Sequence, residues 1–371
     1  MGYIMKINRI DVFQVTYRLV DERYSWSRGH AVTSFLSSIV KISTDEGISG
    51  FGEVCPLGSG YMDAHARGVP AGIAELGPVL LGQDPRRIRA VNALMDVTMG
   101  GHNYVKSPLD IACWDILGKA TGSPVATLLG GMCVEEYPLY RAIPQRSPEE
   151  MADDVKRYRA EGYHRFQLKV GGQADDDVRR IKAVRSVLDP ADVLVADANT
   201  GWEQHAAIRV VNGVREDDVY IEAPCATYEE CLVVRRHTRL PFVLDEVITG
   251  ALPFLRALGD GAMDVVNIKI SRVGGLTKAV QLRNLCETVG IAMTLEDSWG
   301  GDVTTATIAH LAGSTRPEFL FSSTDFNSYI DVTLADDAPR RNNGRLAVPS
   351  GPGLGIHVNE KAMGKPVVTL V

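Results

Sequence analysis

The sequence lacks the features of membrane proteins and of nucleic-acid binders. No stretch of its 371 residues approaches 18 consecutive apolar side chains, so it predicts no transmembrane helix. Acidic residues outnumber basic ones by 46 to 39, a formal net charge of −7. Proteins that bind DNA or RNA usually carry an excess of basic residues, which this sequence does not have. We therefore expect no nucleic-acid partner and no membrane partner.

Cysteine is scarce and unpatterned. The six cysteines include no CxxC pair, so they predict neither a zinc site nor a disulfide framework. Reduced thiols of a cytosolic protein fit this usage better. Residues 1–15 alternate apolar and polar side chains like a strand and contain no signal-peptide core, although Met5 offers an alternative start that would make residues 1–4 an extension. We expect a cytoplasmic protein.

Nucleotide-binding loops and histidine metal sites are also missing. The chain contains no GxxxxGK[ST] motif, and its glycine cluster at 351–355 follows no strand and opens no helix, which excludes a dinucleotide-binding fingerprint. The eight histidines are scattered without ligand spacing. Any metal site must therefore be sought among other residue types.

The composition that is present, 45% hydrophobic and 23% charged residues, is typical of a soluble globular protein, and the length favours two domains. Strand-like runs come first, at residues 7–17, 37–44 and 48–53. Ser107-Pro108 then predicts the start of a helix over residues 109–120. We expect an α+β module over residues 5–130.

From about residue 135, short β-rich runs alternate with helical stretches. Eight runs are visible, at residues 138–143, 165–170, 193–199, 219–223, 242–247, 265–270, 292–297 and 319–324. Such alternation with short links indicates parallel strands, and eight units in roughly 200 residues match the smaller β/α barrels. We expect an α/β fold with a TIM-like barrel over residues 135–335. An open doubly wound sheet is the alternative that the pattern leaves open.

Ionisable side chains stand where these apolar runs end. They are Lys169, Asp197, Glu222, Asp245, Lys269 and Glu296, at spacings of 28, 25, 23, 24 and 27 residues. Each spacing equals about one strand–helix unit. In a barrel, these side chains would come from consecutive strands and meet at the carboxyl-terminal mouth, where barrel enzymes carry their active sites.

The three consecutive carboxylates, Asp197, Glu222 and Asp245, form an oxygen-only set without histidine or cysteine. Such ligands suit Mg²⁺, and three buried negative charges would repel one another unless a cation neutralised them. Capping of the following helices is the alternative for any one of them, but matched spacing across three strands favours a metal site.

The two lysines lie on the strands that flank the carboxylates. Lys169 and Lys269 would face each other across the metal, and a lysine near Mg²⁺ in a dry site has a lowered pKa and can act as a base. The alternative is that both lysines only form salt bridges to the same carboxylates. Sequence geometry does not choose between these interpretations.

These segments resemble the enolase superfamily and, within it, the muconate-lactonizing-enzyme branch. The strings that carry the resemblance are FQLKVG, VADAN, YIEAP, VLDEV and NIKIS, with ACWD and the terminal GPGLGI, so it covers nearly the whole chain. It implies a barrel of seven or eight strands under a cap to which both chain ends contribute, here residues 5–130 and 336–371. It also implies a homo-oligomer.

The resemblance implies a reaction as well. Mg²⁺ on Asp197, Glu222 and Asp245 would bind a substrate carboxylate and stabilise the enediolate formed when the α-proton leaves. The mandelate-racemase branch would instead use a histidine near the end of the seventh strand, and residues 292–301 contain none. One departure is Gln167, because the branch usually carries Lys-x-Lys there. A positive neighbour that would lower the pKa of Lys169 is therefore missing.

Residues after the last two strands resemble the proline-handling members of the branch, namely proline-betaine epimerases and cis-3-hydroxy-L-proline dehydratases. Asp297 would pair with a substrate ammonium, and Phe326 would offer its ring face to the same cation. Tyr61 and Trp26 lie in cap segments that the resemblance brings over the site. Ordinary packing of the cap also accounts for both aromatic side chains.

The predicted function is Mg²⁺-dependent α-proton abstraction from a small carboxylate substrate, a cyclic amino acid. The favoured reaction is dehydration of cis-3-hydroxy-L-proline, with proline-type 2-epimerisation as a side activity. Betaine-type members carry a larger aromatic where Phe326 stands, which favours an unmethylated amine. The alternatives are an epimerase of proline betaine or hydroxyproline betaine, a muconate cycloisomerase or dipeptide epimerase, and a non-catalytic metal-binding barrel.

Overall fold

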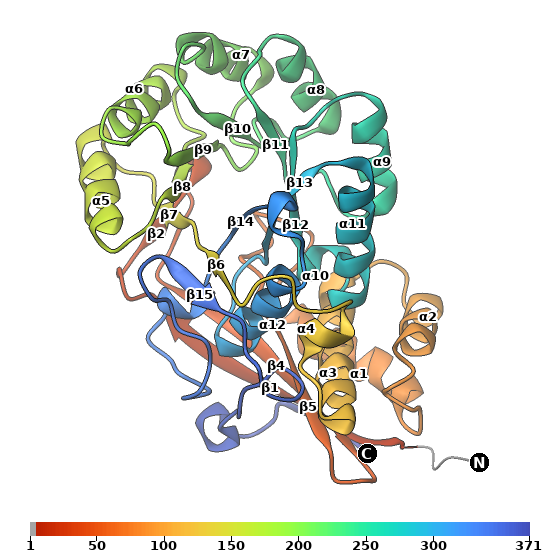
Figure 1. The fold of residues 1–371 in the computed structure, drawn as a ribbon. Helices are drawn as coiled ribbons and strands as arrows, with labels where there is room; N and C mark the ends of the chain where they lie inside the picture. Colours follow the sequence, from red (N-terminus) through yellow and green to blue (C-terminus); the bar gives the residue numbers. More distant parts are fainter. Residues whose placement is uncertain (1–4) are drawn as a thin grey trace.

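The computed structural model of the protein describes residues 5–371, so the predicted extension at residues 1–4 lies outside the described residues. An eight-stranded sheet forms the centre of the molecule, ringed by helices on its outer side (Figure 1). Its strands are β7 (Arg141–Ile143), β8 (Arg165–Lys169), β9 (Val193–Asp197), β10 (Tyr220–Glu222), β11 (Phe242–Leu244), β12 (Val265–Lys269), β13 (Ala292–Glu296) and β14 (Leu320–Ser323).

Every neighbouring pair in this sheet is parallel, and the strand order follows the chain order from β7 to β14 without a reversal. A doubly wound sheet would require a switch point where the order reverses, so that alternative is excluded. The two edge strands meet where the Tyr140 amide donates to the Ser323 carbonyl at 2.8 Å. The expected β/α barrel is confirmed.

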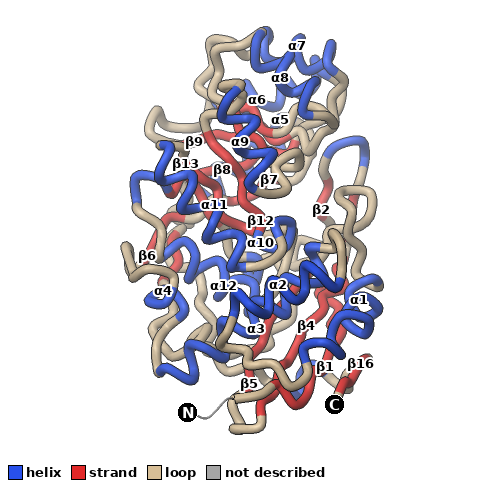
Figure 2. Tube along the Cα trace, turned by 90° about the vertical axis from the view of Figure 1, so that its right-hand side faces the viewer, coloured by secondary structure: helices blue, strands red, loops and turns tan. Residues whose placement is uncertain are grey.

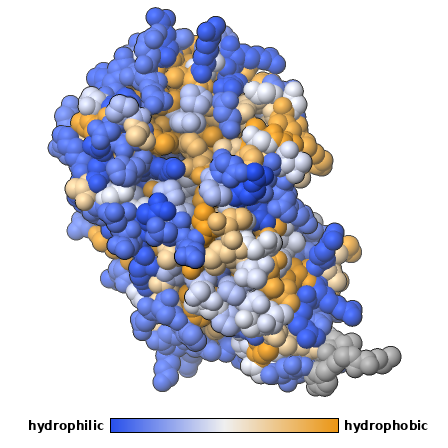
Figure 3. All heavy atoms as spheres, in the orientation of Figure 1, coloured by the Kyte–Doolittle hydropathy of each residue, from blue (hydrophilic) through white to orange (hydrophobic). Residues whose placement is uncertain are grey.

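Helices connect consecutive strands and cover the outside of the sheet. They are α5 (Pro148–Ala160), α6 (Ala174–Arg185), α7 (Gln204–Gly213), α8 (Tyr228–Arg236), α9 (Ala251–Gly259), α10 (Ile270–Val273), α11 (Leu276–Val289) and α12 (Asp302–Gly313). Ser147 and Thr227 start α5 and α8 with complete capping boxes. Hydrophilic side chains dominate the upper rim in Figure 3, whereas hydrophobic ones gather toward the middle of the same face.

The N-terminal part forms a separate strand-rich cap at one end of the molecule (Figure 2). Its antiparallel sheet has the order β16-β1-β4-β5, with bounds β1 (Ile7–Arg18), β4 (Ser34–Thr44), β5 (Ser49–Val54) and β16 (Val368–Leu370). Its helices are α1 (Gly68–Leu76), α2 (Ile88–Thr98) and α3 (Asn103–Thr121). The expected cap is present, while the boundaries 5–130, 135–335 and 336–371 remain predictions.

Shorter elements complete the chain. They are β2 (Tyr24–Ser25), β3 (Ala31–Val32), α4 (Val125–Leu128), β6 (Glu136–Pro138), β15 (Arg345–Ala347), and 3-10 helices at Ser27–Gly29, Gly77–Leu80, Pro317–Phe319, Phe326–Ser328 and Glu360–Met363. Within residues 5–371, no helix combines the length and the apolar character needed to cross a membrane. All six cysteines are free thiols, as the unpatterned spacing predicted.

The predicted start of the cap helix at Ser107-Pro108 is wrong. Helix α3 begins at Asn103, and Pro108 lies inside it. The added first turn is buried, with Tyr104 and Val105 in the cap core, and this tertiary burial outweighs the hydrogen bond that the proline forfeits. Sequence propensity at a single proline could not reveal that packing.

Gly52 on β5 explains how closely α3 approaches the cap sheet. A Cβ atom at this position would lie 1.9 Å from the Pro108 carbonyl oxygen, so only glycine fits. We expect Gly52→Ala to lower the free energy of unfolding by about 1–3 kcal/mol or more, since overpacking forces the backbone to move. Gly259→Ala on α9, where a Cβ meets nothing within 4 Å, is the control and should leave stability unchanged or raise it by up to about 1 kcal/mol, because alanine favours a helix more than glycine does. Urea unfolding checks both, and equal midpoints would contradict this explanation.

Candidate active site

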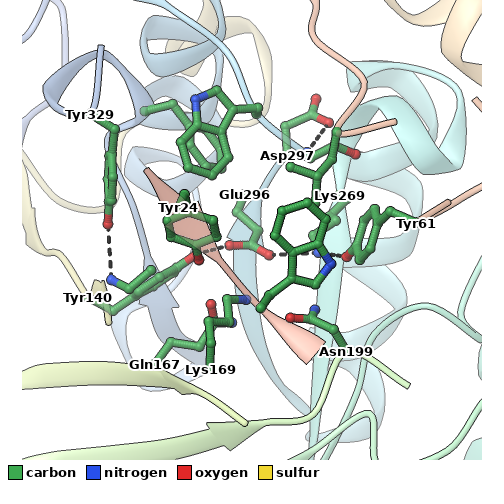
Figure 4. Close-up of a pocket in the computed structure, with 16 residues that line it drawn as sticks. Tyr24, Tyr61, Tyr140, Gln167, Lys169, Asn199, Lys269, Glu296, Asp297 and Tyr329 are labelled. Atoms are coloured by element: carbon green, nitrogen blue, oxygen red, sulfur yellow. Dashed lines mark hydrogen bonds and ion pairs between the residues drawn. The ribbon is translucent and has the colours of Figure 1, made fainter. Parts of the chain in front are cut away.

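A pocket opens at the carboxyl ends of the barrel strands, beneath the cap (Figure 4). Its lining comes from both parts of the molecule: Tyr24, Trp26, Leu57, Tyr61, Tyr140, Ala142, Gln167, Lys169, Asn199, Lys269, Glu296, Asp297, Ser298, Trp299, Phe326 and Tyr329. Six of the nine residues predicted for the site thus line one pocket. The other three, the predicted metal ligands, lie beside it in contact with its lining.

The three predicted ligands come from adjacent strands. Asp197 ends β9 and is the register partner of Glu222 on β10, while Asp245 follows β11 directly. All three side chains are buried. Burial raises the pKa of Glu222 well above its usual value, and the charges of Asp197 and Asp245 raise it further. The barrel therefore concentrates negative charge at this point.

Both lysines contact this carboxylate row. The Lys169 Nζ lies 2.5 Å from Asp197 Oδ2, and the Lys269 Nζ lies 2.6 Å from Asp245 Oδ2 and 3.2 Å from Glu296 Oε1. The salt bridges that the sequence left open as an alternative are thus present. Since both lysines also line the pocket, the same side chains can contact a bound molecule.

The carboxylates that the two lysines contact raise the lysine pKa values, whereas the lowered pKa predicted from the sequence belongs to a lysine beside bound Mg²⁺ and stays a prediction. Burial alone would lower the pKa of Lys169, but Asp197 together with Tyr24 and Glu222 outweighs burial, and the pKa is raised. The pKa of Lys269 is raised in the same way, chiefly by Asp245. The physical reason is direct pairing of each ammonium with a carboxylate, which favours the charged form.

Further side chains complete the contacts of Asp245. Arg272 forms an ion pair with it, and the Tyr61 hydroxyl donates to its Oδ2 at 3.1 Å while accepting from the Lys269 ammonium at 2.5 Å. Among residues 5–371, no three His, Cys, Asp or Glu side chains have their donor atoms gathered as a metal cluster. Cationic partners occupy oxygens of two of the three carboxylates. In its chemistry, an all-carboxylate buried set still fits a hard divalent ion.

Two neutral amides hold the central carboxylate. Gln167 donates to Glu222 Oε2 at 3.0 Å, and Asn267 donates to Glu222 Oε1 at 2.9 Å and to Glu296 Oε1 at 2.7 Å. Sequence reasoning missed Asn267. The signal was there, because Asn267 stands two residues before Lys269 as Gln167 stands two before Lys169, and period-two alternation puts each pair on one strand face.

Asp297, the predicted ammonium partner, lies in the pocket wall at the end of β13. Its carboxylate accepts from the Ser271 amide at 3.0 Å, from the Ser271 hydroxyl and from the Ser298 amide at 2.6 Å. Burial raises its pKa to about 6, while these hydrogen bonds oppose the rise. Asp297 is therefore ionised near neutral pH and is held in a fixed orientation.

Aromatic rings form the rest of the wall. The ring centroids of Phe326 and Trp299 lie 5.3 Å apart. Trp26 stacks on His30, with 5.5 Å between the ring centroids. The hydroxyl of Tyr140 is hydrogen-bonded to Glu296, and Figure 4 shows these two side chains pointing toward each other at the centre of the pocket. Tyr24, Tyr140 and Tyr329 carried no sequence motif, so sequence reasoning missed them.

Glu246 follows Asp245 and is partly buried, but no cationic side chain of residues 5–371 forms an ion pair with it. Its carboxylate instead accepts from the neutral Asn199 amide at 3.1 Å, and its other oxygen has no hydrogen-bond partner among the described residues. Burial, with the charges of Asp245 and Asp197, raises the pKa of Glu246 to about 7. Partial protonation lowers the cost of burying this carboxylate without a cationic partner.

Two family models match most of the chain. The model described as "Enolase C-terminal domain-like" matches residues 150–362, and that described as "Mandelate racemase / muconate lactonizing enzyme, N-terminal domain" matches residues 23–130. The chain belongs to the mandelate racemase/muconate lactonizing enzyme family. The family resemblance predicted from the five strand-end motifs is thereby confirmed.

Individual members of this family match the chain over its whole length. A cis-3-hydroxy-L-proline dehydratase from Roseibium aggregatum is 56% identical over 98% of this chain and 99% of its own. A solved mandelate racemase/muconate lactonizing enzyme from Roseovarius nubinhibens ISM superposes with a TM-score of 0.96 at 41% identity, covering 99% and 98% of the two chains. A second from that organism, complexed with magnesium, has a TM-score of 0.95 at 34% identity, covering 99% and 100%.

Proposed function

We propose that the protein catalyses Mg²⁺-dependent dehydration of cis-3-hydroxy-L-proline. The observation that carries the reaction class is the pair of buried lysines, Lys169 from β8 and Lys269 from β12, that line one pocket. The substrate is supported by the full-length likeness to the Roseibium dehydratase. Asp297 and Phe326 in the same wall suit an ammonium-bearing ring.

The stereochemistry of this substrate suits two lysines. In cis-3-hydroxy-L-proline the hydroxyl and the carboxylate share one ring face, so the α-hydrogen and the hydroxyl are anti. One lysine takes the α-proton as base, and the other gives a proton to the departing hydroxyl, which leaves as water. The electrons of the Cα–H bond form the Cα–Cβ double bond. The enamine product then tautomerises to pyrroline-2-carboxylate.

Mg²⁺ would be held by Asp197, Glu222 and Asp245. When bound, it neutralises the charge that develops on the substrate carboxylate as the α-proton leaves. Gln167 and Asn267 orient Glu222 through its two oxygens. Tyr61, which contacts both Asp245 and Lys269, orients Lys269 beside the acidic row. Trp26, from the cap, lines the same pocket.

Epimerisation at the α-carbon is a second activity that the same pair allows. If the acidic lysine returns a proton to the α-carbon from the opposite face, the substrate is inverted and keeps its hydroxyl. A muconate cycloisomerase or a dipeptide epimerase would use the same lysines without an ammonium partner at Asp297. The homo-oligomeric state and the cytoplasmic location remain predictions.

A substrate panel tests the proposal. The purified protein with Mg²⁺ is incubated separately with cis-3-hydroxy-L-proline, L-proline, proline betaine and a dipeptide, and products are identified by mass spectrometry. We expect loss of one water from cis-3-hydroxy-L-proline only, and a chelator should stop that reaction. Turnover of the dipeptide with none of the imino acid would refute the assigned substrate while preserving the lysine chemistry.

Asp297 provides a sharper test of the ammonium contact. We expect Asp297→Asn to lower kcat/KM on the order of 10²–10³-fold, since it leaves the substrate charge buried without its partner. Because the pKa of Asp297 is about 6, wild-type kcat/KM should fall as the pH drops through 6, where the carboxylate is protonated and loses its charge. The Asp297→Asn variant should lack this fall in kcat/KM, which forms the acidic limb of the wild-type pH profile.

Ser271→Ala is the matched control for this pH profile. It keeps the Asp297 carboxylate but removes a hydrogen bond that lowers its pKa, so the acidic limb should move to higher pH. Steady-state kinetics from pH 5 to 9 measure all three proteins. If kcat/KM fell at the same acidic pH in both variants as in the wild type, another group would be responsible for the fall. That result would refute the role of Asp297.

A further inference from the structure

Glu53 is a buried carboxylate of the cap that reaches into the barrel. It lies on β5, and its side chain accepts hydrogen bonds from two cap hydroxyls, Tyr17 at 2.7 Å and Ser37 at 2.7 Å. It also accepts from two barrel amides, Gly301 at 2.9 Å on Oε1 and Thr304 at 2.8 Å on Oε2. Each carboxylate oxygen therefore receives one backbone N–H from the barrel.

The two amides flank the first turn of α12. Amides at a helix start have no intrahelical acceptor, so a carboxylate there both satisfies them and interacts favourably with the helix dipole. Helix α12 has no side-chain cap at Gly301, the residue that precedes it. Glu53 thus supplies from the cap the acceptor that the barrel sequence itself does not supply.

The segment that α12 anchors is the recognition loop, residues 297–301, which carries Asp297 and Trp299 into the pocket. Other side chains of the cap also pack against this loop. The Trp299 ring stacks on Phe35 at 4.3 Å and meets Tyr24 edge-on at 5.1 Å. A Cβ on Gly301 would lie 2.6 Å from the Tyr17 hydroxyl. The other contacts between the cap and the recognition loop are mostly apolar, and Glu53 adds a carboxylate to them.

We propose that Glu53 is a positioning residue for substrate recognition, which fixes the recognition loop from the cap so that Asp297 and Trp299 keep their places in the pocket. The importance of Asp297 within this inference rests on the proposed function. A displacement of about 1 Å in such a loop can cost on the order of 10²-fold in rate without touching the reacting atoms.

Glu53→Gln is the decisive variant. An amide offers only one acceptor oxygen, so its NH₂ group must face either the Gly301 or the Thr304 amide. Asp115→Asn is the matched control. Asp115 is a buried cap carboxylate that also accepts from two backbone amides, Phe51 at 2.9 Å and Leu354 at 2.9 Å, but it has no contact with the recognition loop.

Two readouts separate positioning from general destabilisation. In Glu53→Gln we expect faster hydrogen–deuterium exchange in peptides that span residues 298–306 and a loss of kcat/KM on the order of 10²-fold. In Asp115→Asn we expect a lower unfolding midpoint but unchanged exchange in those peptides and kcat/KM within a few-fold of wild type. If Glu53→Gln fails to fold, Tyr17→Phe removes one donor to the same carboxylate and should shift both readouts in the same direction by less.

A double variant adds a test that a structural role would not satisfy. Glu53→Gln combined with Asp297→Asn should lose little more kcat/KM than Asp297→Asn alone, while the two losses of stability add. Wild-type protein that does not turn over cis-3-hydroxy-L-proline would refute the proposed function. Unchanged exchange at residues 298–306 in Glu53→Gln, or equal kinetic losses in Asp115→Asn, would instead overturn the inference about Glu53.

Discussion

Replacement of either pocket lysine by methionine is expected to lower kcat for dehydration by at least about 10³-fold, near the upper range for loss of a general acid or base. Methionine keeps an unbranched apolar stem of similar length, so Lys169→Met and Lys269→Met should retain the fold. Each lysine is nearly buried and paired with a carboxylate of the acidic row. Initial rates with cis-3-hydroxy-L-proline and saturating Mg²⁺ measure the effect.

The two lysine variants should differ in a second measurement. The variant that lacks the base should show no exchange of the substrate α-hydrogen with solvent deuterium. The variant that lacks the acid should still exchange it, because proton abstraction does not need the leaving group to depart. If both variants exchanged at the wild-type rate, neither lysine would be the base and the assigned chemistry would be wrong.

Lys106→Met is the matched control for these variants. Lys106 is a buried lysine paired with Asp96 at 2.8 Å, but it lies on α3 of the cap and does not line the pocket. Its replacement should affect stability while kcat stays within a few-fold of wild type. A large catalytic loss in Lys106→Met would indicate that removal of any buried ammonium disturbs the protein.

Removal of Glu222, the central one of the three carboxylates, is expected to have a large effect on Mg²⁺ binding. Glu222→Gln should lower Mg²⁺ affinity by more than 10²-fold, since even partners of metal ligands contribute 10- to 100-fold. The wild-type protein should gain about 2.7 kcal/mol of stability at a Mg²⁺ concentration 100 times its dissociation constant. Glu222→Gln should gain far less at the same concentration. Titration calorimetry and thermal unfolding with and without Mg²⁺ measure both quantities.

Glu246→Gln is the control for the metal site. Glu246 is buried in the same region, yet it accepts from Asn199 rather than completing the row of Asp197, Glu222 and Asp245. It should keep Mg²⁺ affinity within a few-fold of wild type. Equal losses of affinity in the Glu222 and Glu246 variants would show that net charge, rather than the three assigned ligands, controls Mg²⁺ binding.

The barrel was predictable because each strand–helix unit repeats the same local pattern. The run at 265–270 became β12 (Val265–Lys269), and Lys169, Asp197 and Glu222 each end a strand as predicted. Buried parallel strands are apolar throughout, so an ionisable residue at the end of one is conspicuous. This local signal and the resemblance of the strand-end motifs predicted the family and six of the residues that line the pocket.

Features that depend on distant contacts could not be predicted. Glu53 and Gly301 are 248 residues apart, and nothing in either segment indicates their hydrogen bond. Helix α3 continues through Pro108 because its first turn is buried against the rest of the cap, which overrides local propensity. The pairing of Lys169 with Asp197 raises a pKa that burial alone would lower, so its sign depends on a spatial contact.

Proton NMR in D₂O tests the central claim most directly. The purified protein with Mg²⁺ is given cis-3-hydroxy-L-proline, and the α-proton signal and the product signals are followed over time. Loss of the α-proton signal together with the appearance of pyrroline-2-carboxylate is the predicted result. Exchange of the α-proton without elimination would make the protein an epimerase. No change in the spectrum, while a dipeptide or an acid sugar does react, would contradict the substrate assigned from Asp297 and Phe326.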